Sequence, residues 1–474
     1  MEKDLNDITR RLFLSRSATG IGTLALASLL EPAAFADAPK KGEHWRGVVQ
    51  KLDYKPRIKR VIHLYMAGGP SHLETFDFKP KLREMHGKPM PDSFTKGQQI
   101  AQLQGSKLVC YGGQHDFVKA GKNGQEISSI FPQLAKVADE LCIVRSMNSD
   151  QINHDPAHTL MNTGSPFSGR PSMGSWLLYG LGSVTEDLPG YVVLTSAGRG
   201  GQMQPIAARQ WSAGFIPGRF QGVHLRSKGE PVLYLDNPEK VERTEERHLL
   251  NAIRSLNEDR FKATQDPEIL TRIAQYEMAF RMQTSVPGLM DVSQEKPETL
   301  EMYGAKPGDG SFASNCLLAR RLAEKGVRFI QLYHRDWDHH GNLKNDIALK
   351  GEEVDRACWA LITDLKQRGM LDDTLILWGG EFGRTPMAQG DGRDHHIKGY
   401  SIWMAGGGVK GGTTYGATDD LGYAAAENPF HTHDLHATML YLFGIEHTKL
   451  TYRFQGRDYR LTDVFGNVAK GVVA

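Results

Sequence analysis

The chain has 474 residues, a formal net charge of +2 at pH 7 and 40% apolar residues. This length allows a large buried core and two or three domains, whereas the near-neutral charge gives no electrostatic basis for binding nucleic acid or a membrane surface. The four cysteines are widely spaced and lack a CxxC pair, so we expect buried apolar side chains rather than a disulfide framework or a cysteine zinc site.

The first 36 residues have the three parts of a twin-arginine signal peptide. Arg10 and Arg11 precede Leu12 and Phe13, residues 18–30 form a weakly apolar segment, and residues 34–36 (AFA) offer small side chains to a signal peptidase. The apolar segment is too short and too rich in Gly, Ala and Ser to span a bilayer, and no later stretch approaches transmembrane length. We therefore expect residues 1–36 to be removed and the mature protein to reside in the periplasm or another extracytoplasmic compartment.

After a short extension over residues 37–58, the pattern predicts one domain over residues 59–466 with two excursions. Residues near 82–123 are polar and glycine-rich, which indicates a loop excursion, and residues 238–300 are charged with apolar side chains at helical spacing, which indicates helices outside the core. Short apolar runs predict strands in the first half of the domain at residues 59–67, 140–147, 191–195 and 231–235.

From residue 311 onward, helices and strands alternate regularly. The predicted helices cover residues 314–325, 349–368 and 434–443, and the predicted strands cover residues 327–332, 375–378 and 400–404. Amphipathic helices that alternate with apolar strands are typical of a sheet covered on both faces. The sequence therefore predicts an α/β fold with a mainly parallel sheet and helices on both faces.

Histidines are concentrated in this second half, where most of them neighbour a carboxylate. Nine of the eighteen lie between His334 and His447, in clusters that follow or immediately precede predicted strands. Imidazole and carboxylate together are the ligands that zinc, iron and manganese prefer, and open α/β folds build their sites at one edge of the sheet. These clusters predict a metal-dependent hydrolase.

Several stretches resemble the alkaline phosphatase and sulfatase superfamily. Residues 369–383 (GMLDDTLILWGGEFG) resemble the run that ends in Asp-His-Gly in sulfatases, residues 400–412 resemble a later strand and its glycine-rich turn, and residues 433–445 resemble the closing helix. The leader together with GGPSHLETFDFKP, HDPAH, HHG and GGEFGRTP resembles an exported, sulfatase-related bacterial family of unknown function. The resemblance implies an alkaline-phosphatase-like core.

The resemblance also suggests ligands after the strand that ends near residue 332. Asp336 and His340 are spaced as DxxxH, like the pair that holds one metal in alkaline phosphatases. Asp338 and His339 form a competing pair in the same turn. Zinc is the expected ion, with manganese, iron and calcium as alternatives.

Two further segments contribute candidate ligands. Glu381 stands where the superfamily has the Asp of Asp-His-Gly, with Phe382 in place of its His, and His396 is placed like the superfamily's last metal histidine. His395 is either a ligand itself or a partner that orients one. We expect Asp336, His340, Glu381 and His396 to share one site.

The nucleophile position of the sulfatases is occupied by His154. The chain has no CxPxR motif and no Cys or Ser at this position, so formylglycine chemistry is excluded. His154 precedes Pro156 at a predicted helix start, with His158 one turn further, and the two are expected to be metal ligands, a nucleophile or an acid/base pair. Arg384 either binds an anionic substrate oxygen or pairs with Glu381.

Two functions follow from these features. The first is an exported metal-dependent hydrolase of phosphate or sulfate esters, acting on a small anionic ester or a sulfated or phosphorylated glycan. The second is a catalytically degenerate relative that binds anionic glycans or envelope partners. The dense histidine and carboxylate clusters favour the first, whereas the missing nucleophile and a first strand that ends at Met66 rather than at an Asp favour the second.

Overall fold

The computed structural model describes residues 47–474 except for residues 99, 197, 201–203, 205 and 233–241. The predicted signal peptide and residues 37–46 of the predicted extension lie outside the described residues. Within the described part of the chain, no helix is both long enough and apolar enough to cross a membrane. The four cysteines are buried and unpaired, as predicted.

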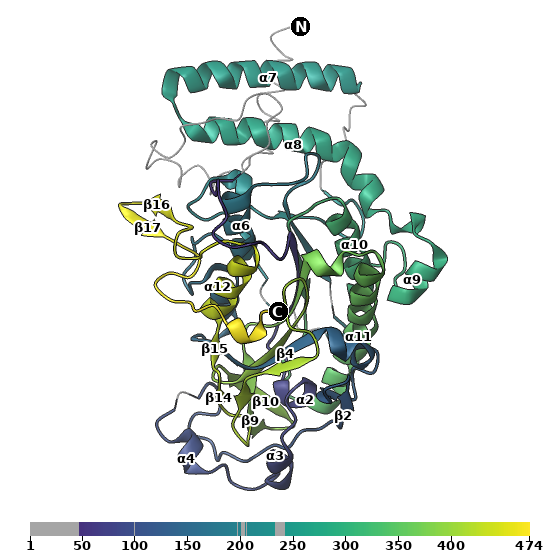
Figure 1. Ribbon diagram of the computed structural model, residues 1–474, viewed down its shortest axis with the longest axis vertical. Coiled ribbons are helices and arrows are strands. Elements are labelled where there is room, and N and C mark those ends of the chain that lie inside the picture. Colours follow the sequence, from purple (N-terminus) through teal and green to yellow (C-terminus); the bar gives the residue numbers. More distant parts are fainter. Residues whose placement is uncertain (1–46, 99, 197, 201–203, 205, 233–241) are drawn as a thin grey trace.

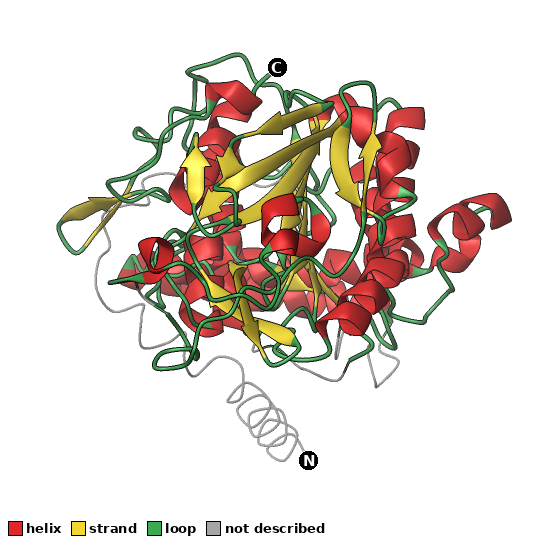
Figure 2. Ribbon diagram, turned by 90° about the horizontal axis from the view of Figure 1, so that it is seen from below, coloured by secondary structure: helices red, strands yellow, loops and turns green. Residues whose placement is uncertain are grey.

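A nine-stranded sheet forms the centre of the described chain (Figures 1 and 2). Its main order is β12-β4-β11-β8-β1-β7-β5-β6, and a ninth strand, β15, pairs with β4. Neighbouring strands are parallel except that β11 runs antiparallel to both β4 and β8, which confirms the predicted mainly parallel sheet. In chain order the strands are β1 Arg60–Met66, β4 Leu141–Asn148, β5 Tyr191–Ser196, β6 Val223–His224, β7 Phe329–His334, β8 Thr374–Gly379, β11 Tyr400–Gly406, β12 Thr413–Tyr415 and β15 Phe430–His431.

Helices cover both faces of this sheet because its central strands are apolar on both sides (Figure 2). In β1, Ile62 and Leu64 belong to one apolar core together with α10 and α11, whereas Val61 and Tyr65 belong to a second core on the opposite face. The helices of the first face are α10 Phe312–Glu324 and α11 Leu343–Gln367; those of the second face are α5 His154–Thr163, α6 Met173–Leu181 and α12 Thr432–Leu442.

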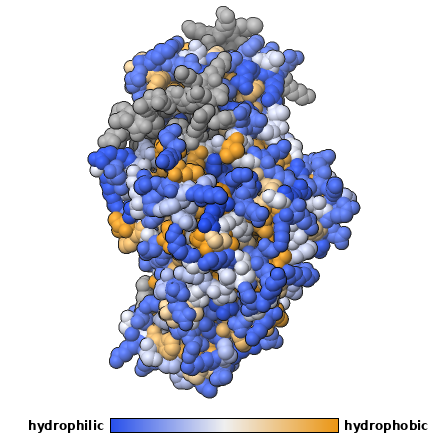
Figure 3. Space-filling model, viewed as in Figure 1, coloured by the Kyte–Doolittle hydropathy of each residue, from blue (hydrophilic) through white to orange (hydrophobic). Residues whose placement is uncertain are grey.

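The segment between β6 and α10 forms helices that lie outside the sheet. Two long helices, α7 Arg243–Thr264 and α8 Pro267–Met290, form an antiparallel pair at one end of the molecule, followed by α9 Pro297–Tyr303 (Figure 1). The prediction of a strand at residues 231–235 is wrong for Pro231 and Val232, which form a bend. Residues 233–235 lie outside the described residues. The face drawn in Figure 3 is mainly hydrophilic, with apolar side chains in small groups.

The segment near residues 82–123 contains short elements and packs on a hairpin of β9 Gly383–Gln389 and β10 Gly392–His396. Leu82, Leu103 and Met387 share a small apolar core that joins the two parts. The sequence patterns did not predict β9 and β10 as strands. The remaining short elements are α2 His72–Thr75, α3 Pro80–Glu84, α4 Asp92–Thr95, β2 Phe117–Ala120, β3 Gln125–Ser128, β13 Ala417–Thr418, β14 Ala425–Glu427, β16 Tyr452–Phe454 and β17 Arg457–Tyr459.

Candidate metal centre

The polar segments that follow several strands meet at one edge of the sheet. β1, β7 and β8 are parallel and in register, with Met66 beside His334 and Tyr65 beside Gly379, so their carboxyl ends lie together. β4 runs in the same direction, because it is antiparallel to β11, which is itself antiparallel to β8. The turns after β7 and β8 and the helix α5 after β4 therefore converge, as expected for an open α/β sheet.

Asp338, in the turn after β7, lies among three histidines from different segments. Its Oδ1 is 2.9 Å from Nε2 of His340 and 3.2 Å from Nε2 of His395, and its Oδ2 is 3.2 Å from Nε2 of His154. The Nε2 atoms of His340 and His395 are themselves only 3.0 Å apart. We call these four residues the Asp338 cluster.

The other ring nitrogen of each histidine in the Asp338 cluster contacts an oxygen that can accept its proton. Nδ1 of His154 is 2.7 Å from Oε1 of Glu381, Nδ1 of His395 is 2.9 Å from the carbonyl oxygen of Ile152, and Nδ1 of His340 contacts Oε1 of Gln389. A carbonyl oxygen only accepts, and a buried carboxylate is an acceptor when ionised, so the proton of each neutral ring belongs on Nδ1. The three Nε2 lone pairs then face the Asp338 carboxylate.

The electrostatics of the cluster favour a negative carboxylate. Burial opposes the ionisation of Asp338, but the charge of Arg384 and hydrogen bonds from the histidines outweigh it and hold the pKa of Asp338 well below its usual range. Burial lowers the pKa of His395, so this ring favours its neutral form. For His154, burial is outweighed by hydrogen bonds to Asp338 and Glu381, which raise its pKa to about 8.

The buried side of the site is formed by Glu381, which follows β8. Its carboxylate accepts the backbone N–H of Gly68 at 3.0 Å and lies 3.5 Å from Nδ1 of His158, whose ring is one turn beyond His154 on α5. The hydroxyl of Tyr65 is 2.8 Å from the same Nδ1. His158 thus contacts Glu381 and Tyr65, on the side of Glu381 away from solvent.

The turn after β1 needs glycine at two positions. Gly68 and Gly69 have φ values of 125° and 73°, and a Cβ on Gly68 would lie 2.5 Å from the backbone nitrogen of Asp338. A Cβ on Gly69 would lie 2.7 Å from the ring of Phe382, which also packs against His154 and His395 with centroids 5.0 and 4.7 Å away. These glycines let the backbone approach the site closely.

Arg384, on β9, is a structural cation of the site. Its guanidinium is 1% exposed, contacts the Asp338 carboxylate, and donates to the carbonyl oxygens of Gly68, Gly69 and Arg393. Arg384 therefore pairs with Asp338 and not with Glu381, and its guanidinium is engaged by protein oxygens, which differs from both predicted roles. The physical reason is that β9 is a strand, and its pleat directs Arg384 inward under the turn after β1.

Of the seven predicted metal ligands, the structure groups Asp338, His340, Glu381 and His395 around His154. His396 contacts the carbonyl oxygen of Tyr423 through Nε2 instead, because successive residues of a strand point to opposite sides and His395 occupies the inward position of β10. The predicted site of Asp336, His340, Glu381 and His396 is therefore not formed. His340 and Glu381 lie instead with Asp338, His395 and His154.

Asp336 and His339 also lie outside the Asp338 cluster. Asp336 has a left-handed φ of 71° and faces Lys350, with Oδ2 4.0 Å from its Nζ. The His339 ring is buried, and neither of its nitrogens has a hydrogen-bond partner among the described residues; burial lowers its pKa to about 3. Asp434, near the later histidines, caps α12 by accepting the backbone N–H of His431 at 2.9 Å.

Sequence patterns missed two glutamines that contact the cluster. Gln389, at the end of β9, accepts from His340 and donates to Oε1 of Gln102 at 2.9 Å, and Gln204 donates to Oδ2 of Asp338 at 3.2 Å. The signal for Gln389 was the Gly390-Asp391 pair, which forms the two-residue turn of the β9–β10 hairpin. No comparable signal marks Gln204.

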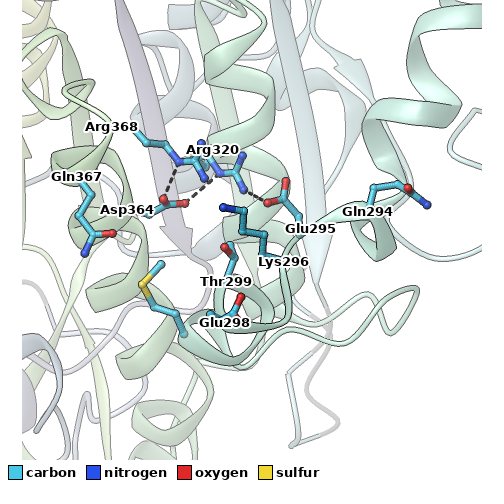
Figure 4. Close-up of a pocket in the computed structure, with 10 residues that line it drawn as sticks. Gln294, Glu295, Lys296, Glu298, Thr299, Arg320, Asp364, Gln367 and Arg368 are labelled. Carbon is cyan, nitrogen blue, oxygen red and sulfur yellow. Dashed lines mark hydrogen bonds and ion pairs between the residues drawn. The ribbon is translucent and has the colours of Figure 1, made fainter.

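A cavity of about 560 Å³ lies elsewhere, between α9, α10 and α11 (Figure 4). Its lining contains Arg320 and Arg368, which both pair with Asp364, and Glu295, which pairs with Arg320 at 2.7 Å. The opposite charges balance within this network. It stabilises the packing of the three helices and contains none of the residues of the Asp338 cluster.

Several solved structures are similar to the chain. They include a protein of the alkaline phosphatase superfamily from Vibrio parahaemolyticus (9% identity, 90% of this chain and 75% of that chain, TM-score 0.35), a phosphonate monoester hydrolase from Silicibacter pomeroyi (12%, 66% and 68%, 0.31) and a sulfatase from Pseudoalteromonas sp. (13%, 82% and 68%, 0.33). Likenesses of this degree assign no activity. A search of the curated proteins found no match. Residues 58–473 match a family model, and the chain therefore belongs to the family described as "Protein of unknown function (DUF1501)".

Proposed function

We propose that the Asp338 cluster binds one divalent metal ion, zinc first among the candidates, through Asp338 and the Nε2 atoms of His154, His340 and His395. The observation that carries this proposal is the convergence of three Nε2 atoms whose Nδ1 partners all accept a proton. Lone pairs this close to one another and to a carboxylate repel unless a cation lies between them or the rings are protonated. Burial disfavours protonation at His395, whereas the contacts with Asp338 and Glu381 favour it at His154, where a bound ion would replace the proton on Nε2.

The spacing of the donor atoms around Asp338 fits the ligands of one ion, and donor atoms of His154, Asp338 and His395 all lie within 4.8 Å of one another. Two ligands that each lie roughly 2.0–2.1 Å from zinc at a tetrahedral angle are roughly 3.3–3.4 Å apart. The contacts of Asp338 with the three histidines span 2.9–3.2 Å, close to that value. The acceptors at Nδ1 are the partners that orient metal-binding histidines in proteins.

We propose further that this centre hydrolyses phosphate or sulfate esters in an extracytoplasmic compartment. Bound zinc would polarise the anionic ester and lower the pKa of water. The protein's side chains orient the ligands: Glu381 fixes the tautomer of His154, and Arg384 holds the Asp338 carboxylate in place. Asp338 and His340 have side chains 15% and 24% exposed, so one side of the cluster is open to a small anionic ester or the charged group of a glycan.

One observation supports the alternative of a binding protein without hydrolytic activity. Arg384 is buried and fully engaged by Asp338 and three backbone carbonyls, so it is not available to stabilise an anionic ester. A hydrolase would then depend on the metal for most of the charge stabilisation. Such a protein would retain the metal and bind sulfated or phosphorylated glycans.

Adjacent histidines provide a matched test. His395→Gln and His396→Gln change neighbouring buried residues of β10, but only His395 belongs to the Asp338 cluster. We expect the wild type and His396→Gln to hold about one zinc per chain by elemental analysis, and His395→Gln to lose it. Assays with p-nitrophenyl phosphate, bis-p-nitrophenyl phosphate and p-nitrophenyl sulfate separate the two functions: metal with turnover supports the hydrolase, metal without turnover supports the binding protein, and a wild type without metal refutes both.

A further inference from the structure

Among the described helices, α7 lies at the end of the molecule and packs on α8 and not on the sheet (Figure 1). α8 inserts Met282, Val286 and Leu289 into the apolar core, whereas α7 has no buried residue. The inner face of α7 contacts α8 through Arg247, whose guanidinium lies 3.9 Å from the ring centroid of Phe280. The opposite face of α7 therefore points away from the body of the protein.

This outer face carries a short apolar stripe. Leu249 and Leu256 are 60% and 72% exposed and lie seven residues apart, which places them two turns apart on the same side of the helix. Ala252 lies between them and is also exposed. Two leucines exposed to this extent on one helix face, with a small residue between them, form a surface against which a second helix can pack closely.

Charged residues of opposite sign flank the stripe at equal distances. Glu245 precedes Leu249 by four residues, and Arg260 follows Leu256 by four residues; both are exposed. Neither forms an ion pair within the described part of the chain, although Arg247, Arg254 and Lys262 of the same helix all do. We call Glu245, Leu249, Ala252, Leu256 and Arg260 the outer stripe of α7.

The outer stripe is complementary to a second copy of itself in the antiparallel direction. A twofold axis near Ala252 places Leu249 of one copy beside Leu256 of the other and Glu245 beside Arg260, and repeats both contacts by symmetry. Parallel pairing would instead bring two Glu245 side chains together and two Arg260 side chains together, which is unfavourable. We propose that two copies of this chain associate through the outer stripes of their α7 helices, in antiparallel orientation.

The size of this contact sets the expected affinity. α7 has 22 residues and is roughly 33 Å long, so one pair of these helices buries less than the roughly 800 Å² per partner of a standard interface. The dimer is therefore weak and dissociates on dilution. It is independent of the metal centre, which lies at the edge of the sheet.

Sedimentation velocity of the full chain tests the association, over roughly 1 to 100 μM, where an interface of this size dissociates. We expect the wild type to shift from monomer to dimer across this range and Leu249→Glu/Leu256→Glu to remain monomeric. Val184→Glu is the matched control, because Val184 is 61% exposed and lies outside α7. A wild type that stays monomeric at the highest concentration, or a leucine variant that still dimerises, overturns the proposal.

A charge exchange tests the antiparallel register. Glu245→Arg and Arg260→Glu each place like charges opposite one another and should shift dimerisation to higher concentration by several-fold, whereas the double variant exchanges the two charges and should restore it. Unchanged helix content by circular dichroism shows that the variants are folded. If the double variant dimerises no better than the single variants, the antiparallel pairing is wrong.

Discussion

Nδ1 of His154 lies 2.7 Å from Oε1 of Glu381, so a fully buried carboxylate determines which nitrogen of that ring carries the proton. The same carboxylate accepts the backbone N–H of Gly68, which keeps Glu381 oriented. The second nitrogen of His154 is left facing Asp338 at 3.2 Å. A single carboxylate thus links the turn after β1 to the first residue of α5 and orients the ring of His154, a ligand in the proposed metal centre.

Replacing Glu381 by Gln should weaken metal binding without removing a ligand. The amide is a poorer acceptor than the carboxylate, so His154 loses the partner that fixes its tautomer, and we expect a loss of roughly 10–100-fold in zinc affinity. Competition with a chromophoric chelator measures this change. Glu324→Gln, which removes a carboxylate from the Arg320 network, is the control and should leave the affinity unchanged. An unaltered affinity in Glu381→Gln would show that Glu381 does not orient the ligand.

The fold was predictable because apolar strands that alternate with amphipathic helices can bury their apolar faces in only a few arrangements of sheet and helices. The strands β1, β4, β5, β7, β8 and β11 and the helices α10, α11 and α12 lie where the patterns indicated, whereas the short strands β6, β12 and β15 had no counterpart in them. The β9–β10 hairpin was missed because its strands carry Arg384, Arg393 and the two histidines, all buried, and so lack the apolar residues that mark a strand. Burial of these polar residues is possible only through partners that are distant in the sequence.

The site was predictable as a region but not as a ligand set. Strand ends placed His154, Asp338 and Glu381 at one edge of the sheet, since parallel strands end together. The choice between His395 and His396 required the register of β10, and a shift of one residue exchanges the two faces of a strand. The left-handed conformation of Asp336, which directs it to Lys350, likewise has no signature in the sequence.

Acid should remove the stabilising contribution of Glu353. Burial alone would raise the pKa of this carboxyl, but hydrogen bonds from His334 and Lys350 outweigh it and lower the pKa to about 2. A carboxyl whose folded pKa lies below its unfolded value of about 4.3 stabilises the protein above that value, and its contribution disappears as pH falls toward 2. We expect Glu353→Gln to lower the free energy of unfolding at pH 7 by on the order of 2 kcal/mol.

Urea unfolding of the wild type and Glu353→Gln between neutral and acidic pH measures this effect, and the difference should shrink as pH falls below about 4. Glu352→Gln is the control, because the neighbouring Glu352 is 70% exposed and pairs only with Arg199 among the described residues. A difference between wild type and Glu353→Gln that stays constant with pH would contradict the low folded pKa.

Export should depend on the arginine pair near the start of the chain. We expect Arg10→Lys/Arg11→Lys to leave the full-length precursor in the cytoplasm, because the twin-arginine pathway reads both guanidinium groups. Cell fractionation follows the location, and N-terminal sequencing of the exported protein should find a start near Asp37. Arg16→Lys, outside the pair, is the control and should be exported normally. Periplasmic yield that is the same for the double variant and the wild type would refute the signal.

The buried ion pair of Glu74 and Arg393 should stabilise the β9–β10 hairpin. Both side chains are fully buried, with Nη2 of Arg393 2.7 Å from Oε1 of Glu74, and Arg393 lies two residues before His395. Glu74→Gln leaves the guanidinium buried without a counter-charge, which costs roughly 3–5 kcal/mol in the free energy of unfolding. Because the hairpin presents His395 to the cluster, we also expect weaker zinc binding.

An exposed pair provides the comparison for that last prediction. Lys81 and Asp420 are 59% and 72% exposed, and water screens their attraction, so Asp420→Asn should leave the urea midpoint unchanged. Urea unfolding and chelator competition on the two variants separate the effects. If Glu74→Gln is as stable as Asp420→Asn, the buried pair does not stabilise the hairpin. If Glu74→Gln is destabilised but binds zinc as tightly as the wild type, then the position of His395 is determined by the carbonyl of Ile152 and the Asp338 carboxylate, and not by Arg393.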